Sequence, residues 1–395
     1  MDNFTFNIPT KTVFGKDTQH EVGKMIKSFG GSKVLLHYGG GSIKKSGLYD
    51  DVTASLRKSG LDFVELGGVV PQPDLKLVYQ GIELAKNEKV DFILAVGGGS
   101  TIDSAKAIGL GFYFDGDIWD VYTKGAAVDK TLPVGNIITI PAAGSESSNS
   151  SVITNYDIKH KQGYGNELIR PVFCIMNPEL FYTLPKNQIA FGVADIISHI
   201  LERYFTISVQ TDIIDGMAES ILKTIMKNAL IIAKDPKNYN AWCQVGLGGS
   251  FAHNNMLGIG RIQAWACHPM CNKLSSTYGV AHGEALAVIT PAWMEYVYKE
   301  NMGMFTQFAV NVMGAEGSYR EADALIMDGI NRFRAFMRQI GAPAAWSDTC
   351  VKTGDLETIA KQVTAYSSGS EKPVAKNGIK ELYWQDVLNI YRMCI

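Results

Sequence analysis

The 395-residue sequence lacks the features that would place it outside the ordinary globular proteins. No uninterrupted apolar run reaches the roughly 20 residues that a membrane-spanning helix needs. The first seven residues, Met-Asp-Asn-Phe-Thr-Phe-Asn, have neither the basic nor the apolar region of a signal peptide. No internal repeat or low-complexity segment stands out. We therefore expect a soluble protein of the cytoplasm.

A large excess of charge is also missing. Lysine and arginine total 37 against 39 aspartate and glutamate, which gives a net charge of -2. Such a chain has no field to attract nucleic acid or an anionic membrane, so we expect neither partner. The six cysteines are scattered through a chain too large to need disulfides, which favours reduced thiols. The length allows two domains, each with its own core.

The N-terminal half alternates short apolar runs with amphipathic segments. This alternation predicts an α/β domain with a doubly wound parallel sheet. The strands are expected at 33–38, 62–66 and 91–96, and the helices at 49–58 and 75–87. A further strand is expected to begin at Ile137 and to continue into a loop of small residues.

A run of glycines, Gly97-Gly98-Gly99-Ser100, follows the third expected strand. Glycines let the backbone approach a ligand closely, because no Cβ lies in the way. We expect Ser100 or Thr101 to cap a helix whose free amide hydrogens favour an anion such as a pyrophosphate. A glycine-rich turn without a ligand is the alternative. The run is neither a Walker loop nor the usual Gly-x-Gly-x-x-Gly.

The periodicity becomes helical from about Leu184 onward, so we place a domain boundary at 184–186. The predicted domains are 1–184, which binds the nucleotide, and 185–395, which is all-α. A polar surface loop is expected at 367–376. Helices are expected at 187–206, 211–234, 239–257, 282–299, 303–314, 319–340 and 381–393.

Four side chains of the helical half indicate a metal site. Asp195 and His199 are four residues apart, so a helix would place both on one face. His268 and His282 each lie among apolar or small residues. One carboxylate and three imidazoles suit a divalent first-row metal. Glu202 returns to the face of Asp195 and could orient a ligating imidazole.

A purely structural interpretation of these residues remains open. Asp195 and His199 could form a buried hydrogen bond that orients a helix. That interpretation leaves the two other histidines and Glu202 without an explanation.

The residues also resemble a known family. Asp195-x-x-x-His199, His268 and His282-Gly283, preceded by the glycine motif of 97–106, are similar to the iron-containing alcohol dehydrogenases. The stretches 39–44, 141–146 and 291–294 are most similar to its butanol dehydrogenase and broad aldehyde reductase branch. The resemblance covers essentially the whole chain. It implies a nucleotide-binding domain, a helical metal-binding domain, a cleft between them and a homodimer.

The resemblance assigns residues as well. It implies that Asp195, His199, His268 and His282 hold the metal and act in catalysis through it. Asn272 stands where the family usually has a histidine thought to relay protons, and an amide cannot accept a proton. Ala143 stands where relatives often have a threonine. The residues implied at the cofactor are Gly39, Gly40, Ser42, Gly97, Gly98, Gly99, Ser100, Asp103, Thr139 and Lys161, and Lys106 matches the same glycine motif.

The activity implied is reversible hydride transfer between NAD(P)H and a small aliphatic aldehyde, with the metal as a Lewis acid. The resemblance favours Fe²⁺, with Zn²⁺ as the alternative. An acidic residue after the first strand would bond the ribose of NAD and repel a 2′-phosphate. Gly39 and Gly40 occupy that position, with Ser42, Lys44 and Lys45 nearby. We therefore expect NADP(H) to be preferred over NAD(H).

Three other functions stay open at this point. A metal-dependent hydrolase or lyase would use the same cluster to activate water, and it would need no nucleotide fold. A polyol or sugar-phosphate enzyme could be built on the same two-domain plan. A nucleotide binder without catalytic activity is the third, and Asn272 makes it less remote.

Overall fold

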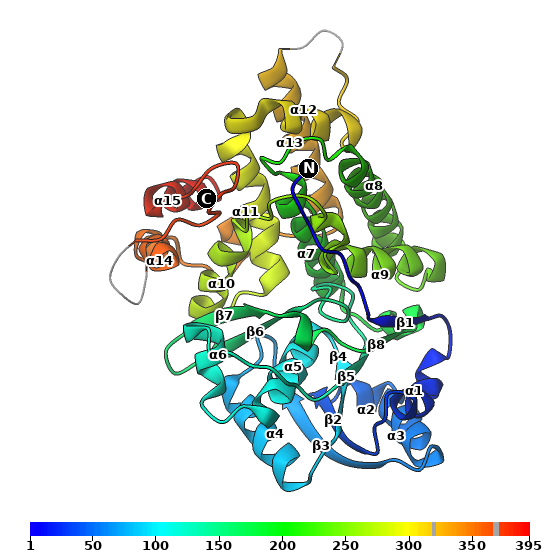
Figure 1. Ribbon diagram of the computed structural model, residues 1–395. Coiled ribbons are helices and arrows are strands. Elements are labelled where there is room, and N and C mark those ends of the chain that lie inside the picture. Colours follow the sequence, from blue (N-terminus) through cyan, green and yellow to red (C-terminus); the bar gives the residue numbers. More distant parts are fainter. Residues whose placement is uncertain (318–320, 366–370) are drawn as a thin grey trace. The chain divides into compact units, whose positions relative to one another are not determined.

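The protein is described here from a computed structural model that covers residues 1–317, 321–365 and 371–395. The chain divides into two compact units, Asn7–Thr183 and Leu184–Ile395, and Met1–Phe6 belongs with the second (Figure 1). Hydrogen bonds explain where the first residues lie. The Met1 ammonium donates to the Val209 carbonyl at 2.7 Å, and the Asp2 amide donates to the Gly260 carbonyl at 2.9 Å.

The first unit is built on a parallel sheet with the strand order β1-β8-β5-β4-β2-β3. This confirms the predicted doubly wound α/β fold. The central strands are nearly continuous apolar runs because both faces of a parallel sheet are covered. An antiparallel pair, β6 and β7, was not predicted. The strands are β1 (Lys11–Phe14), β2 (Lys33–Gly39), β3 (Asp62–Val69), β4 (Phe92–Gly97), β5 (Val134–Ile138), β6 (Ser150–Asn155), β7 (His160–Gly165) and β8 (Phe173–Met176).

Helices surround this sheet, and α4 and α5 pack against each other. Val34, Leu36, Leu94 and Phe173 belong to the core cluster that β2, β4 and β8 share with α1 and α3. The helices are η1 (Thr18–Glu21), α1 (Val22–Ser28), α2 (Ser42–Lys45), α3 (Leu48–Lys58), α4 (Leu75–Asn87), α5 (Gly99–Tyr113), α6 (Ile118–Lys124), η2 (Glu167–Ile169) and η3 (Pro178–Phe181).

The second unit is helical, as the periodicity predicts. Its longer helices are α7 (Lys186–Tyr204), α8 (Asp212–Lys234), α9 (Tyr239–His253), α10 (Cys267–Tyr278), α11 (His282–Val297), α12 (Met302–Asn311), α13 (Ala322–Gln339), α14 (Leu356–Thr364) and α15 (Trp384–Arg392). Short 3-10 turns are η4 (Met256–Gly258), η5 (Tyr298–Asn301), η6 (Trp346–Asp348) and η7 (Thr353–Asp355). Not one helix among the described residues is long and apolar enough to cross a membrane.

Several boundaries differ from the sequence prediction. Helices α10 and α14 were not predicted, and the segment expected to be helical to residue 257 ends at His253 because Asn255 adopts a left-handed backbone (φ 77°). Residues 319 and 320 of the helix expected at 319–340 lie outside the described residues, and so do 367–370 of the expected loop 367–376.

Helices α7 and α11 form the centre of the helical unit, where they run side by side (Figure 1). Gly283 makes this close approach possible. A Cβ on Gly283 would lie 1.9 Å from the Phe191 carbonyl oxygen of α7, so any larger residue would push the two backbones apart. The neighbouring residue His282, at the start of α11, is thereby held next to α7.

Candidate metal centre and nucleotide-binding loop

Helix α7 provides the first half of the candidate metal centre. Its 3.6-residue period places Asp195, His199 and Glu202 on one side, and all three are at least 95% buried. Apolar neighbours such as Ile196, Ile197 and Ile200 are completely buried as well. The helix therefore carries ionisable groups into the core of the unit, where each needs a partner or a metal.

Helices α10 and α11 bring the other two predicted ligands to Asp195. The Nε2 atoms of His268 and His282 lie 3.6 and 3.7 Å from Asp195 Oδ1. One ligand atom from each of these three residues lies within 4.8 Å of the others, a grouping that a single metal ion fits. His199 adjoins this group, with its Nδ1 3.3 Å from Asp195 Oδ1 and its ring centroid 4.4 Å from that of His268.

Three buried atoms of this cluster lack a hydrogen-bond partner among the described residues. They are Asp195 Oδ1, His199 Nδ1 and His268 Nε2. A buried polar atom without a partner is costly, by roughly 1–3 kcal/mol each. A carboxylate oxygen and imidazole nitrogens are also the donor atoms that divalent transition metals prefer. The residues present therefore fit the metal that the sequence predicts.

Glu202 contacts the His268 imidazole, which confirms the predicted contact with one of these rings. Its Oε2 pairs with His268 Nδ1. Its Oε1 accepts from the amides of Ala266 and Cys267, both at 2.6 Å. A carboxylate at the N-terminus of a helix satisfies amides that have no partner within the helix. One side chain of α7 thus anchors the start of α10 and fixes the ring of His268.

The ring of His282 has a different partner. Its Nδ1 lies 3.0 Å from Cys271 Sγ, and the same thiol lies 3.2 Å from the His282 carbonyl oxygen. In both His268 and His282, Nδ1 contacts another side chain and Nε2 faces Asp195.

Sequence reasoning missed a second group of side chains at this site. Arg203 is 1% exposed and donates to the His199 carbonyl at 2.9 Å and to His253 Nδ1 at 3.0 Å. Its guanidinium lies 4.6 Å from the ring centre of Trp265. The His253 ring is 4.3 Å from that of His199. The position of Arg203 four residues after His199 was the available signal, because it shares that face of α7.

The electrostatics of the cluster differ from ring to ring. Burial lowers the pKa of His199 well below its ordinary value, and the nearby His253 and His268 act in the same direction. Burial also opposes the charged form of His268, but the carboxylates of Glu202 and Asp195 outweigh it and raise the pKa of His268 to about 9. Burial lowers the pKa of Arg203 to about 9.

Asn272 lies on α10, one helical turn after His268. Its Oδ1 is a further buried atom that has no hydrogen-bond partner among the described residues. The amide offers an acceptor and two donors but no group that titrates.

The predicted nucleotide loop is a strand, a glycine run and a helix in that order, from β4 to α5. The expected cap is wrong: helix α5 begins at Gly99 and Gly98 is its N-cap, so Ser100 and Thr101 lie in the first turn. Gly98 has no side chain to occupy the first amides. Internal packing also requires glycine, because a Cβ on Gly97 would lie 2.4 Å from Thr101 Oγ1 and one on Gly99 2.8 Å from Ala143 Cβ.

Lys106 and Asp103 of α5 bind the segment 145–152 rather than solvent. The Lys106 ammonium donates to the carbonyls of Ser145, Ser148 and Ser150 at 2.7–3.0 Å. The Asp103 carboxylate accepts from Ser145 Oγ at 2.5 Å and from the Val152 amide at 3.0 Å. Burial lowers the pKa of Lys106 to about 8 and raises that of Asp103.

The remaining predicted cofactor residues fall in the same unit. Gly39 ends β2, and Gly40 precedes Ser42, the first residue of α2. A Cβ on Gly40 would meet nothing within 4 Å, so internal packing does not require this glycine. Thr139 follows β5 and its amide donates to the Gly97 carbonyl at 3.0 Å. Lys161, on β7, pairs with Thr154 and lies near Asp103.

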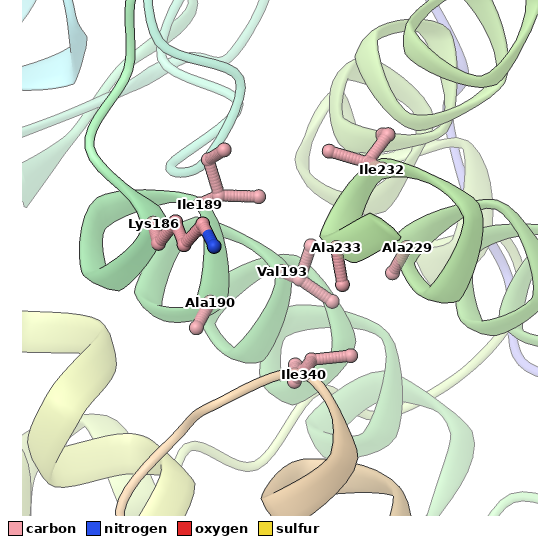
Figure 2. A pocket seen from close by; sticks show the side chains of 8 residues that line it. All are labelled: Lys186, Ile189, Ala190, Val193, Ala229, Ile232, Ala233 and Ile340. Atoms are coloured by element: carbon pink, nitrogen blue, oxygen red, sulfur yellow. The ribbon is translucent and has the colours of Figure 1, made fainter. Parts of the chain in front are cut away.

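A small cavity in the helical unit does not contain the candidate site. It has a volume of about 40 Å³, and Figure 2 shows apolar side chains of α7 and α8 pointing into it. The residues that line it are Lys186, Ile189, Ala190, Val193, Ala229, Ile232, Ala233 and Ile340, and none of the four predicted ligands is among them.

Comparison with known proteins agrees with the resemblance. Residues 9–178 match the family described as iron-containing alcohol dehydrogenase, and residues 189–393 match the C-terminal domain of the Fe-containing alcohol dehydrogenase family. The chain belongs to the iron-containing alcohol dehydrogenase family. It is therefore an oxidoreductase, an alcohol dehydrogenase of this family.

Individual members of the iron-containing alcohol dehydrogenase family are similar along their whole length. The NADH-dependent butanol dehydrogenase A of Clostridium acetobutylicum is 37% identical, over 99% of each chain. The NADPH-dependent aldehyde reductase YqhD of Escherichia coli is 33% identical, over 92% of this chain and 93% of the relative. A crystal structure of NADH-dependent butanol dehydrogenase A from Thermotoga maritima has a TM-score of 0.94 at 40% identity, and the match covers 100% of this chain and 99% of that one.

Proposed function

We propose that this alcohol dehydrogenase interconverts small aliphatic aldehydes and alcohols with a nicotinamide cofactor, at a metal held by Asp195, His199, His268 and His282. The observation that carries the proposal is that ligand atoms of Asp195, His268 and His282 lie within 4.8 Å of one another in the helical unit. A divalent cation bound there supplies Lewis-acid polarisation of the substrate oxygen. A nicotinamide cofactor supplies or accepts the hydride.

Other side chains of the site orient the candidate ligands. Glu202 and Cys271 each contact Nδ1 of an imidazole and thereby leave its Nε2 available as a ligand. The buried Arg203 holds the His199 carbonyl and His253 in place. Asn272 cannot exchange a proton, so the proton that the product alcohol needs comes from solvent or from a cofactor hydroxyl.

The nucleotide binds at the start of α5 in this proposal. The amides of the first turn and the helix dipole favour a pyrophosphate there. Lys106 and Asp103 act indirectly, by fixing the segment 145–152.

The proposed preference is NADP(H) over NAD(H). No carboxylate stands at Gly39 or Gly40 to repel a 2′-phosphate, and Lys44 and Lys45 follow closely. Relatives differ on this point: the butanol dehydrogenase A of Clostridium acetobutylicum, at 37% identity, is NADH-dependent, and the aldehyde reductase of Escherichia coli, at 33% identity, is NADPH-dependent. Steady-state kcat/KM values for both reduced cofactors with one aldehyde decide the matter. A value for NADH equal to or above that for NADPH contradicts the preference.

The proposed metal is Fe²⁺, and Zn²⁺ is the alternative because the same ligand set suits both. Elemental analysis of protein purified without air distinguishes them.

The activity itself is tested with a panel of aliphatic aldehydes and NADPH, before and after chelation. We expect cofactor oxidation that chelation abolishes and that added Fe²⁺ or Zn²⁺ restores. The Asp195→Ala variant should lose turnover while it retains nucleotide binding. Turnover that survives chelation would contradict the role of the metal, and nucleotide binding without turnover of any aldehyde in the panel would contradict the proposed substrate class.

We further propose a homodimer that works in the cytoplasm. The edge strand β1 has exposed side chains, and Phe4, Phe6 and Phe14 are 38–52% exposed, which is unusual for aromatic residues so close together in sequence. All six cysteines are free thiols, as expected in a reducing compartment. Light scattering of the purified protein gives the oligomeric state, and a monomer at micromolar concentration contradicts the proposal.

A further inference from the structure

The contact between Cys271 and His282 has no role in the sequence prediction. Both residues lie on helices. Cys271 lies in the first half of α10 and is completely buried, and His282 is the first residue of α11. Sulfur Sγ of Cys271 lies 3.0 Å from His282 Nδ1 and 3.2 Å from the His282 carbonyl oxygen, with Ser275 Oγ at 3.7 Å.

One arrangement of the hydrogen atoms satisfies the contacts of Cys271 with both the ring and the carbonyl of His282. A thiol has one hydrogen, and the His282 carbonyl oxygen can only accept. When the thiol donates to that carbonyl, its sulfur is left as an acceptor, and the ring must then carry its hydrogen on Nδ1. The Nε2 atom, which faces Asp195 Oδ1 at 3.7 Å, consequently has its lone pair directed to the cluster.

The two ring nitrogens of His268 are arranged in the same way, and the partner of its Nδ1 is the Glu202 carboxylate. Its Nε2 also faces Asp195 Oδ1. Imidazoles that bind metals usually have the second ring nitrogen hydrogen-bonded, which fixes tautomer and orientation. The Nδ1 atoms of His268 and His282 thus both contact a hydrogen-bond acceptor. The acceptor is a carboxylate at His268 and a weaker one, a neutral sulfur, at His282.

We propose that Cys271 is a positioning residue that fixes the Nδ1–H tautomer and the orientation of His282 as a metal ligand. The proposal rests on the proposed function, because it assumes that His282 binds the metal. Cys271 is not itself a ligand in this assignment, since its sulfur lies on the Nδ1 side of the ring.

The chain offers a matched control in Cys267, a second buried cysteine one turn earlier on α10. The Cys267→Ala and Cys271→Ala variants remove the same group from the same helix, but only the second removes an acceptor from His282. In Cys271→Ser a hydroxyl replaces the thiol, and it can still donate to the carbonyl and accept from Nδ1. All variants are compared with the wild type as full-length protein with Co²⁺ as the probe, and thermal unfolding confirms that each is folded.

Two quantities are measured: the rate of Co²⁺ release into excess chelator, and the visible absorption bands of bound Co²⁺. Loss of a hydrogen bond behind a metal ligand weakens binding by about 10–100-fold. We expect release from Cys271→Ala to be faster by about that factor with shifted bands, while Cys271→Ser and Cys267→Ala stay within about threefold of the wild type.

Two results would overturn the inference. One is Cys271→Ala with wild-type release and bands, and the other is Cys267→Ala with the same defect as Cys271→Ala, which would indicate loss of packing alone. Failure of the proposed function is distinguishable: the wild type would then bind no Co²⁺, or would bind it equally well after Asp195→Ala.

Discussion

At the scale of the single residue, His37 makes the stability of the protein depend on pH. Its ring is completely buried between the Leu66 carbonyl at 2.8 Å and Ser104 Oγ at 2.9 Å. Burial lowers its pKa to about 4, although the Leu66 carbonyl acts in the opposite direction. The unfolded chain, with an ordinary pKa near 6.5, binds more protons between these values. Stability conferred by neutral His37 is therefore complete above about pH 6.5 and is lost as the pH falls towards 4.

We expect the protonation of His37 in the unfolded chain to lower the free energy of unfolding by about 2 kcal/mol when the pH falls from 7.5 to 5. Denaturant titrations of the wild type and of His37→Gln at the two pH values measure it. Glutamine can keep both hydrogen bonds but does not titrate. The loss of stability on acidification should therefore be about 2 kcal/mol smaller in His37→Gln than in the wild type. Equal losses in the two proteins would show that His37 is not the group responsible.

At Asn272 the chain departs from the pattern that the family resemblance implies, and we expect this residue to affect the pH dependence of catalysis. In Asn272→His we expect the pH profile of kcat to gain an ionisation in the range of an imidazole, near pH 6.5. The Asn272→Gln variant is the control, because it changes size but adds no titrating group. A profile for Asn272→His that matches the wild type would argue against any proton relay at this position.

At the scale of the helix, the approach of α7 to α11 depends on Gly283. In Gly283→Ala the new Cβ would lie 1.9 Å from the Phe191 carbonyl, so α11 must shift and carry His282 away from Asp195. We expect a loss of about 1–3 kcal/mol of stability or more, together with a lower metal content. Thermal unfolding and elemental analysis measure the two effects.

A second glycine controls for the substitution itself. Gly216 lies in α8, and a Cβ there would meet nothing within 4 Å. Gly216→Ala should raise stability by up to about 1 kcal/mol, because alanine favours the helix, and it should leave the metal content unchanged. If Gly283→Ala behaves like Gly216→Ala, the packing of α7 on α11 is not what positions His282.

Element types were predictable where one periodicity covers the whole segment. The spacing of Asp195, His199 and Glu202 on α7 is set by local geometry, so the sequence predicts their common face. Helix α10 was not predicted because Pro269, one asparagine and two serines weaken its helical signal. The helix begins there because Glu202, 64 residues earlier than Ala266, accepts its first amides. A contact between residues so far apart in the chain cannot be predicted from the local sequence.

The same reason explains what was missed around the site. His253 ends α9 and meets Arg203 only because α9 packs against α7. The cap of α5 was predicted as a serine or threonine, whereas the tight turn after β4 places Gly98 there. The residue pattern and the family resemblance both predicted the four candidate ligands, and the structure added the side chains that contact them.

At the scale of the whole molecule, the two compact units predict that two ligands stabilise different parts of the chain. The candidate metal ligands all belong to Leu184–Ile395, and the glycine loop of the nucleotide belongs to Asn7–Thr183. A ligand that binds only the folded state stabilises it by about 2.7 kcal/mol at a concentration 100 times its Kd. Hydrogen exchange locates that stabilisation along the chain.

We expect Zn²⁺ to slow amide exchange in α7, α10 and α11, and NADPH to slow it in the first turns of α5 and in 145–152. Asp195→Ala should abolish the first pattern and keep the second, because the nucleotide residues of the Asn7–Thr183 unit are intact. Metal-dependent protection that survives Asp195→Ala would mean that the ion binds elsewhere. The cluster on α7 would then be a buried hydrogen-bond network that orients helices, the structural interpretation that its residue types alone leave open.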